Sequence, residues 1–238
     1  MQVVILAGGL GTRLGPITTT IPKPLVCVND KPYLEYQIEY LKKFGFLDIL
    51  LLVGHLGEKI ESHFGNGEQF GVNIRYSYEK EQLGTAGGLK NAEPAITSDR
   101  FLLLYGDSFL PINLTELTDS FLESDKKCFL VIYNNQKNTD VKNNVKVDRE
   151  NNVCAYEKGG GGRDFLYVDS GILCLKKEIL EDIPENTNWS LELGVFPRLI
   201  ENNDILGYVT TTRFYDIGTP KRLKDAESFF KEWKINDE

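Results

Sequence analysis

The chain has 238 residues and a formal net charge of −8, with 41% hydrophobic and 26% charged residues. These values are typical of a soluble globular protein with one large α/β domain or two small ones. The negative charge argues against nucleic acid as a general partner. No apolar run reaches membrane-spanning length, and no basic segment precedes an apolar stretch and cleavage site at the N-terminus, so we expect a cytoplasmic protein with no membrane partner.

The first stretch, Gln2–Leu14, joins an apolar run to a loop with three glycines in four residues. A short apolar run that ends at glycines predicts a buried strand. Backbone N–H groups in such a loop can approach an anion closely. Thr12 adds a hydroxyl, and Arg13 adds a fork of donors that suits phosphate oxygens. We therefore predict a phosphate-binding loop, although it has neither the last glycine of G-x-G-x-x-G nor a Walker sequence.

The segment Ile21–Pro24 is expected to be extended, because proline restricts itself and the residue before it. A short strand is expected to follow over 24–28. Lys23 would then lie on a stiff segment. A protein of net charge −8 repels phosphates, so it needs local cations such as Arg13, Lys23 and Lys158, together with a divalent metal.

The first half of the chain alternates strands with helices. Strands are expected at 3–6, 48–53, 72–78 and 101–105, and helices at 33–41, around 60–64 and up to about 93 after a second glycine-rich loop at 79–89. This order predicts right-handed crossovers and a mainly parallel sheet with helices on both faces. Ligands bind beyond the carboxyl ends of such strands, so we expect the loops 7–13, 79–88 and 106–108 to share one edge.

The second half is more mixed and predicts an antiparallel extension that carries a second substrate. Strands are expected at 128–133, 143–147, 151–158, 166–175, 205–208 and 212–216, helices at 114–122, near 177, at 189–201 and at 220–234, and a turn at 159–162.

Two aspartates are candidate metal ligands. Asp107 follows a buried strand, where a carboxylate is costly without a partner, and Mg²⁺ is bound by one or two carboxylates plus phosphate oxygens and water. The alternative is that Asp107 caps the next segment. Asp216 precedes a Gly-Thr-Pro turn, and it is either a second metal ligand or a helix N-cap.

The cysteines and histidines do not indicate a metal site. The four cysteines are Cys27, Cys128, Cys154 and Cys174. They form no C-x-x-C pair, and we read them as reduced core residues. The two histidines, His55 and His63, are too few for a histidine site.

Four motifs resemble the signatures of the sugar-1-phosphate nucleotidylyltransferases: 7–24, with GGLGTRL and IPKP, 79–88, 106–108 and 214–220. The resemblance covers essentially the whole chain, and the likeness is greatest to bacterial guanylyltransferases of mannose-like or D-glycero-D-manno-heptose 1-phosphates. It implies a Rossmann-like, glycosyltransferase-A-like α/β fold in a single domain, 1–238. Residues 1–125 would form the nucleotide-binding half. Residues 126–238 would form the sugar-binding half, which includes a smaller antiparallel extension.

The resemblance also implies a reaction in which an NTP and a sugar 1-phosphate give an NDP-sugar and pyrophosphate. The NDP-sugar would be used for the synthesis of surface polysaccharide. The catalytic residues would be Arg13, Lys23 and Asp107, with the cofactor Mg²⁺ on Asp107 and Asp216. The nucleotide-binding residues would be Leu6, Ala7, Gly8, Gly9, Gly11, Thr12, Glu79, Gly84 and Thr85. The sugar-binding residues would be Asn143, Glu157, Lys158, Asp169 and Ser170. No covalent enzyme intermediate is needed.

The residue at position 79 favours GTP. Relatives that use uridine or thymidine nucleotides commonly carry Gln five residues before Gly84, where this chain has Glu79. A carboxylate only accepts hydrogen bonds, so it fits the two adjacent donors of guanine and is repelled by the carbonyls of uracil and thymine. The alternative is that Glu79 only ends a strand in water. The glycines of the 79–88 run would let the backbone approach the base, to which Thr85 would donate.

Departures from the family pattern leave the sugar open. Asp169 stands where relatives have Asn, and Asn143 stands where they often have Gly. Glu157 and Lys158 could also be a solvated strand end.

The other open alternatives concern the function of the whole chain. They are a uridylyl-, thymidylyl- or cytidylyltransferase, a non-catalytic nucleotide-sensing subunit, and a nicotinamide-dependent oxidoreductase. The missing glycine and Val53 at the end of the second strand disfavour the oxidoreductase. A homo-oligomer is also left open.

Overall fold

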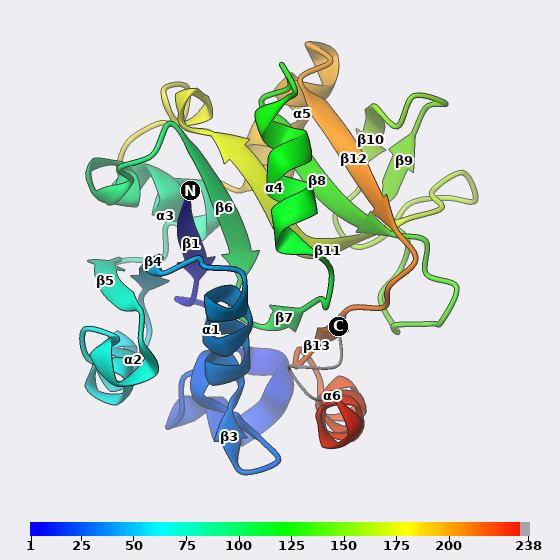
Figure 1. The fold of residues 1–238 in the computed structure, drawn as a ribbon. Coiled ribbons are helices and arrows are strands. Elements are labelled where there is room, and N and C mark those ends of the chain that lie inside the picture. Colours follow the sequence, from blue (N-terminus) through cyan, green and yellow to red (C-terminus); the bar gives the residue numbers. More distant parts are fainter. Residues whose placement is uncertain (234–238) are drawn as a thin grey trace.

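A seven-stranded sheet forms the centre of the computed structural model, which describes residues 1–233 (Figure 1). Its order is β12-β8-β11-β6-β1-β4-β5. The strands are β1 (Gln2–Leu6), β4 (Asp48–Val53), β5 (Asn73–Tyr78), β6 (Arg100–Tyr105), β8 (Cys128–Tyr133), β11 (Val168–Lys176) and β12 (Ile205–Thr210). Strand β11 runs antiparallel to β6 and β8, whereas the other neighbours in this sheet are parallel. The predicted mainly parallel sheet is confirmed.

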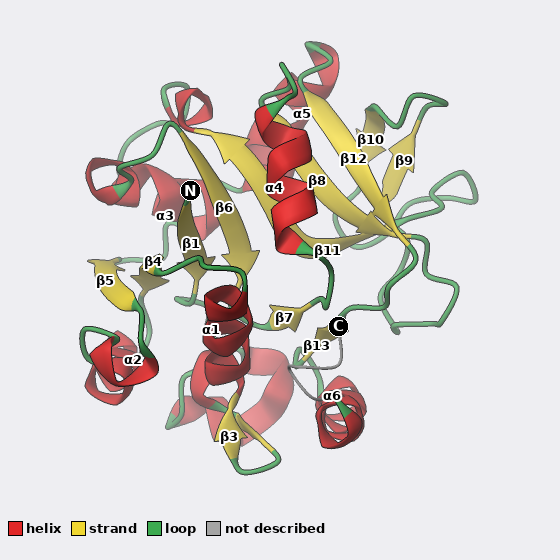
Figure 2. Ribbon diagram, viewed as in Figure 1, coloured by secondary structure: helices red, strands yellow, loops and turns green. Residues whose placement is uncertain are grey.

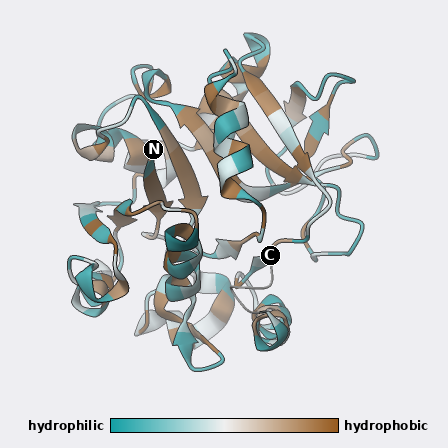
Figure 3. Cartoon of the chain, viewed as in Figure 1, coloured by the Kyte–Doolittle hydropathy of each residue, from teal (hydrophilic) through white to brown (hydrophobic). Residues whose placement is uncertain are grey.

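Helices cover both faces of this sheet, as predicted (Figure 2). The helices are α1 (Tyr33–Lys43), α2 (Gly57–Phe64), α3 (Gly84–Ala92), α4 (Leu114–Leu122), α5 (Phe196–Glu201) and α6 (Pro220–Glu232). Alternate residues of β1 divide the core: Val3 and Ile5 join the apolar cluster with α1, α2 and α4, while Val4 joins the cluster with α3 and α5. The apolar strands stand out between the more hydrophilic helices (Figure 3). Helix α6 packs on α1, where Phe230 stacks on Tyr36 with ring centroids 4.0 Å apart.

Three small antiparallel sheets complete the fold. They pair β2 (Cys27–Val28) with β3 (Lys31–Pro32), β7 (Ser108–Phe109) with β13 (Tyr215–Asp216), and β9 (Val145–Val147) with β10 (Val153–Tyr156). The β9–β10 pair agrees with the antiparallel extension expected in the second half. The β7–β13 pair joins segments from the two halves of the chain, directly after β6.

Short helical turns replace several segments that were expected to be extended or loops. They are the 3₁₀ helices η1 (Thr12–Thr19), η2 (Lys23–Leu25) and η3 (Glu68–Phe70). The 3₁₀ helix η4 (Glu93–Ala95) follows α3, the 3₁₀ helix η5 (Lys177–Leu180) lies where a helix was expected near 177, and η6 (Leu191–Val195) is a π-helix. The expected strand over 24–28 was wrong at its start, because the Val26 N–H donates to the Lys23 carbonyl (3.1 Å) and closes a turn. The helix expected over 189–201 divides into η6 and α5. The helix expected over 220–234 is α6, and Lys234 lies outside the described residues.

Two further expectations concern burial and membranes. Cys128 and Cys174 are buried, but Cys27 and Cys154 are exposed, so reading all four cysteines as core residues was wrong. Both exposed residues lie in short strands outside the central sheet. None of the helices in the described part of the chain is both long and apolar enough to cross a membrane.

Candidate active site

A cavity of about 450 Å³ lies at the carboxyl ends of β1 and β6. Its wall includes these residues singled out from the sequence: Leu6, Ala7, Gly8, Gly9, Gly11, Thr12, Arg13, Lys23, Glu79, Gly84, Thr85 and Asp107. The same wall includes Leu10, Pro24, Gln82, Tyr105, Gly106, Asn188 and Gly218, which were not singled out as site residues. The loops expected to share one sheet edge therefore meet around one cavity.

The loop after β1 offers unpaired backbone donors to this cavity. In the part of the chain that the structure describes, no acceptor contacts the backbone N–H groups of residues 8–11. A Cβ added to Gly8 would lie 3.1 Å from the Gly54 nitrogen, so packing against β4's end explains that glycine. A Cβ added to Gly9 would meet nothing within 4 Å. The missing side chain at Gly9 leaves open space beside free N–H groups, which is the environment that an anion needs.

Lys23 and Asp107 form an ion pair in the cavity wall. Lys23 is buried, with 8% of the residue exposed. Burial opposes ionisation of Asp107, but the Lys23 ammonium outweighs it and, with help from Ser108 and Arg13, lowers the pKa of the Asp107 carboxyl. Asp107 is therefore an ionised carboxylate that has a buried cation as its partner. Asp107 was alternatively expected to cap the next segment, but the next helix, α4, is capped by Asn113.

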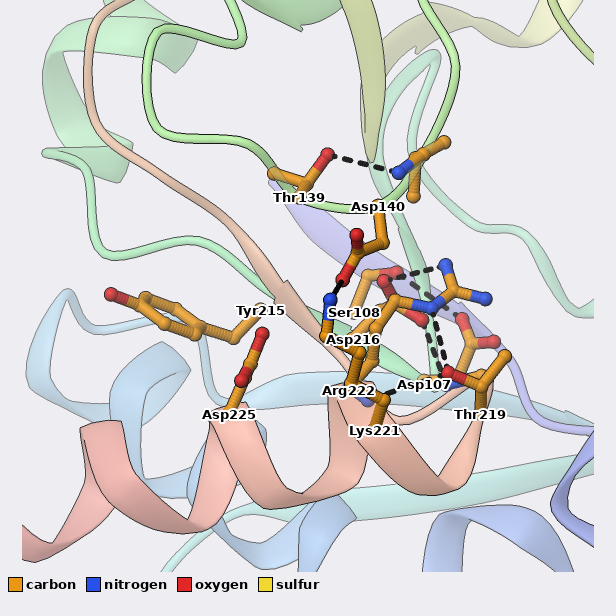
Figure 4. Close-up of polar contacts among 12 residues, drawn as sticks. Asp107, Ser108, Thr139, Asp140, Tyr215, Asp216, Thr219, Lys221, Arg222 and Asp225 are labelled. Atoms are coloured by element: carbon orange, nitrogen blue, oxygen red, sulfur yellow. Dashed lines mark hydrogen bonds and ion pairs between the residues drawn. The ribbon is translucent and has the colours of Figure 1, made fainter.

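The β7–β13 pair brings Asp216 close to Asp107. The Ile217 N–H donates to the Asp107 carbonyl (3.1 Å), and the buried Asp216 carboxylate accepts from the Gly218 N–H (2.7 Å) and from Arg222 Nη1 (2.9 Å). Figure 4 shows Arg222 on the first turn of α6, directed at Asp216. Thr219 is the N-cap of α6, so the alternative N-cap role for Asp216 was wrong.

The two carboxylates repel each other. Burial, and then the nearby Asp107 carboxylate, raise the pKa of Asp216. Each carboxylate has more acceptor positions than its observed hydrogen bonds use. Two adjacent oxygen ligands that repel each other fit a hard divalent cation such as Mg²⁺, which would complete its shell with phosphate oxygens and water.

Helix α3 begins inside the second glycine-rich run, which was expected to be a loop. The N–H groups of Ala86 and Gly87 donate to the Trp189 carbonyl (2.9 and 3.1 Å). A Cβ added to Gly84 would lie 2.6 Å from that oxygen, and one added to Gly87 would lie 2.3 Å from the Thr187 carbonyl. These two glycines are required because the 187–189 segment packs on the start of α3, a contact between distant segments that the sequence pattern does not reveal.

Glu79 and Thr85 both line the cavity, in different hydrogen-bonding states. Glu79 is half-buried, one carboxylate oxygen accepts from the Leu83 N–H (3.1 Å), and burial raises its pKa. Glu79 therefore does not simply end the strand in water. The Thr85 hydroxyl donates to Glu192 (3.1 Å) and accepts from the Leu191 N–H (2.8 Å). Its one proton is engaged within the protein, in contrast to the expectation that it is directed at a base.

The residues predicted to bind the sugar lie outside the cavity wall. Lys158 is 54% exposed on its side chain and pairs with Glu192 at 3.6 Å, while its neighbour Glu157 is exposed. The Asp169 carboxylate accepts from the Tyr156 hydroxyl (3.1 Å) and the Gly171 N–H (2.8 Å), and burial raises its pKa to about 6.

Two of these predicted sugar ligands are used inside the protein. The Asn143 side chain accepts from Asn135 (2.8 Å) and donates to the Phe165 carbonyl (3.0 Å). Ser170 is 1% exposed, and its hydroxyl donates to the Val131 carbonyl (2.8 Å). The structure gives Ser170 a role in joining β11 to β8 and does not support a sugar contact.

Glu192 is a buried charged residue beside this cavity that the sequence analysis did not identify. It is 7% exposed and contacts Thr85 and Tyr105 in the cavity wall. In the sequence it lies in an apparently ordinary helical segment, so only the three-dimensional contacts reveal it.

Comparisons with known proteins agree with this arrangement. Residues 2–232 match the nucleotidyl transferase family. The chain is 36% identical over 224 residues to D-glycero-alpha-D-manno-heptose 1-phosphate guanylyltransferase of Campylobacter jejuni, covering 93% of this chain and 96% of that protein. It is 32% identical over 238 residues to N-acetylmuramate alpha-1-phosphate uridylyltransferase of Neisseria meningitidis, covering 98% and 100%. The crystal structure of HddC from Yersinia pseudotuberculosis complexed with GMP-PN superposes with a TM-score of 0.81 at 29% identity, covering 96% and 99%.

Proposed function

The chain belongs to the nucleotidyl transferase family and is a sugar-1-phosphate nucleotidyltransferase, and we propose that it transfers GMP from GTP to a manno-configured heptose or hexose 1-phosphate. The products are a GDP-sugar and pyrophosphate. The observation that carries the proposal is the half-buried Glu79 carboxylate in the cavity wall. The same wall contains the loop 8–11, whose backbone N–H groups are unpaired, together with Lys23 and Asp107.

The charged groups have distinct roles in this proposal. An oxygen of the sugar phosphate attacks the α-phosphorus of GTP in line, the bond to the β-phosphate oxygen breaks, and pyrophosphate leaves. Arg13 and the N–H groups of residues 8–11 hold the β- and γ-phosphates, and the Lys23 ammonium neutralises charge on the α-phosphate. Positioning and electrostatic stabilisation then supply most of the rate enhancement. The half of the chain before about residue 125 binds the nucleotide, and the second half binds the sugar.

Asp107 and Asp216 would hold Mg²⁺. When bound, the cation supplies positive charge that stabilises the phosphate oxygens. Arg222 keeps Asp216 in place through its ion pair, and Lys23 does the same for Asp107.

Glu79 supports GTP over pyrimidine nucleotides. A carboxylate can accept from the ring N–H and the exocyclic amino group of guanine together, whereas uracil and thymine present carbonyl oxygens on both sides of a single N–H. The heptose guanylyltransferase relative supports the same nucleotide and a manno-configured sugar. The uridylyltransferase relative makes UTP the alternative to be tested.

Nucleotide titrations by calorimetry test this proposal without turnover. We expect GTP to bind at least about tenfold more tightly than UTP, dTTP, CTP or ATP. Glu79→Gln should reduce this preference, because the amide replaces one acceptor by a donor. Glu81→Gln, which changes an exposed carboxylate two residues further along, is the matched control and should retain it. Tighter binding of UTP or dTTP by the unmodified protein would contradict the GTP assignment.

A further inference from the structure

Glu192 is a buried carboxylate at the edge of the cavity, within the π-helical turn η6. Turns of this type are rare and occur frequently at functional sites. A buried charge is costly unless charged or polar partners surround it. Such partners surround Glu192, and they come from segments that are far apart in the sequence.

The two oxygens of Glu192 contact both halves of the chain. One oxygen accepts from the Tyr105 hydroxyl (3.2 Å) at the end of β6. The other accepts from Thr85 on the first turn of α3 (3.1 Å) and from Ser190, and it lies 3.6 Å from the Lys158 ammonium. Burial opposes ionisation, yet the hydrogen bonds from Ser190, from the Glu192 backbone N–H and from Thr85, together with the Lys158 ammonium, lower the pKa of Glu192, so the group is a carboxylate.

The segment around Glu192 is fixed against the nucleotide side of the cavity. The Trp189 N–H donates to the Leu83 carbonyl (2.8 Å), and Asn188 donates to the Gln82 carbonyl (3.0 Å). Asn188 and Gln82 themselves line the cavity. Lys158, in contrast, follows β10 in the other half of the chain, and its side chain is 54% exposed. Glu192 therefore holds the long, largely exposed Lys158 side chain beside a cavity wall that is fixed by hydrogen bonds.

We propose that Glu192 is a positioning residue, which holds the Lys158 ammonium at the boundary between the nucleotide cavity and the second half of the chain, where it meets the phosphate of the sugar 1-phosphate. The proposal rests on the proposed function, because it takes a sugar 1-phosphate as the second substrate. A lysine has many rotamers, and fixing it before the substrate binds lowers the entropic cost of binding.

The test compares the unmodified protein with Glu192→Gln, Lys158→Met and the double variant in steady-state assays of pyrophosphate release. Glu192→Gln keeps the size of the side chain and removes its charge. We expect each single variant to raise KM for the sugar 1-phosphate about tenfold, as for the loss of a charged hydrogen bond, while KM for GTP changes less than about threefold. The double variant should resemble the single variants, because both remove the same interaction. Glu201→Gln, an exposed carboxylate on α5, is the control.

Three outcomes overturn the inference. The first is a sugar-phosphate KM within about twofold of the unmodified value for Glu192→Gln. The second is a double variant whose KM increase is the product of the two single increases, which would show that the residues act independently. The third is unchanged activity of Lys158→Met, which decides the matter even if Glu192→Gln does not fold in melting experiments.

A failure of the proposed function gives a different result. If the unmodified protein neither binds a sugar 1-phosphate in calorimetry nor releases pyrophosphate, the proposed function fails and this inference fails with it. Normal turnover by all variants would overturn the roles of Glu192 and Lys158 and leave the proposed function standing.

Discussion

At the scale of single residues, the proposed reaction depends most on the Lys23–Asp107 ion pair. Both members line the cavity, and each compensates the burial of the other. Lys23→Met and Asp107→Asn should each lower kcat/KM at least about a hundredfold, because preorganised charge that faces the phosphates is lost. Pyrophosphate release measures the effect, and circular dichroism checks that the variants fold. Lys231→Met, at an exposed lysine on α6, is the control, and near-normal turnover by Lys23→Met would contradict the role of Lys23.

Asp169 makes stability depend on pH. Burial raises its pKa to about 6, above the value of about 3.9 for an unfolded aspartate. The folded state thus binds this proton more tightly, and the resulting stabilisation is fully present below about pH 4 and lost as the pH rises through 6.

Asp169→Asn should therefore remove the loss of stability that accompanies ionisation of Asp169 as the pH rises. We expect the variant to match the unmodified protein near pH 4 and to be more stable at pH 8 by about 1–2 kcal/mol, because a neutral amide replaces a buried carboxylate. Thermal melting at the two pH values measures this. Asp164→Asn, at a carboxylate whose side chain is 78% exposed, is the control. An equal difference at both pH values would show that the titration of Asp169 does not contribute.

At the scale of elements, the β7–β13 pair determines how the two aspartates meet. Gly218 follows this pair and lines the cavity. A Cβ added there would lie 2.6 Å from Asp216 Oδ1 and 2.8 Å from Arg222 Nη2, so both groups would have to shift.

Gly218→Ala should consequently weaken Mg²⁺ binding without unfolding the protein. We expect the Mg²⁺ concentration for half-maximal activity, and the Kd for Mg²⁺ in calorimetry, to rise about tenfold, equivalent to about 1.4 kcal/mol. Gly162→Ala, where an added Cβ would meet nothing within 4 Å, is the matched control. An unchanged Mg²⁺ dependence would argue against Asp216 as a ligand.

Elements with strong apolar patterns could be predicted from the sequence, and contacts between distant segments could not. The strand at 48–53 and the helix at 114–122 have their predicted bounds, because apolar periodicity and turn residues define them locally. The start of α3 could not be predicted, since the Trp189 carbonyl that accepts from its first N–H groups lies about a hundred residues away along the chain. Glu192 was missed for the same reason. Lys23 and Asp107 could be placed at this cavity from the sequence, because each belongs to a distinctive local motif.

At the scale of the whole molecule, the net charge of −8 opposes the binding of anionic substrates. Arg13 and Lys23 provide positive charge locally, in a cavity at the carboxyl ends of the strands. The small β7–β13 sheet and Glu192 connect the two halves at this cavity. The fold thus brings segments from both halves of the chain together beside one cavity.

Pyrophosphate release with Mg²⁺ tests the central claim most directly. The assay compares GTP, UTP, dTTP, CTP and ATP, each with mannose 1-phosphate, D-glycero-D-manno-heptose 1-phosphate, glucose 1-phosphate and N-acetylmuramate 1-phosphate. We predict the highest kcat/KM for GTP with a manno-configured sugar 1-phosphate. A higher kcat/KM with UTP or dTTP would contradict the role of Glu79 as the base-reading residue, and no release with any pair would contradict the catalytic assignment itself.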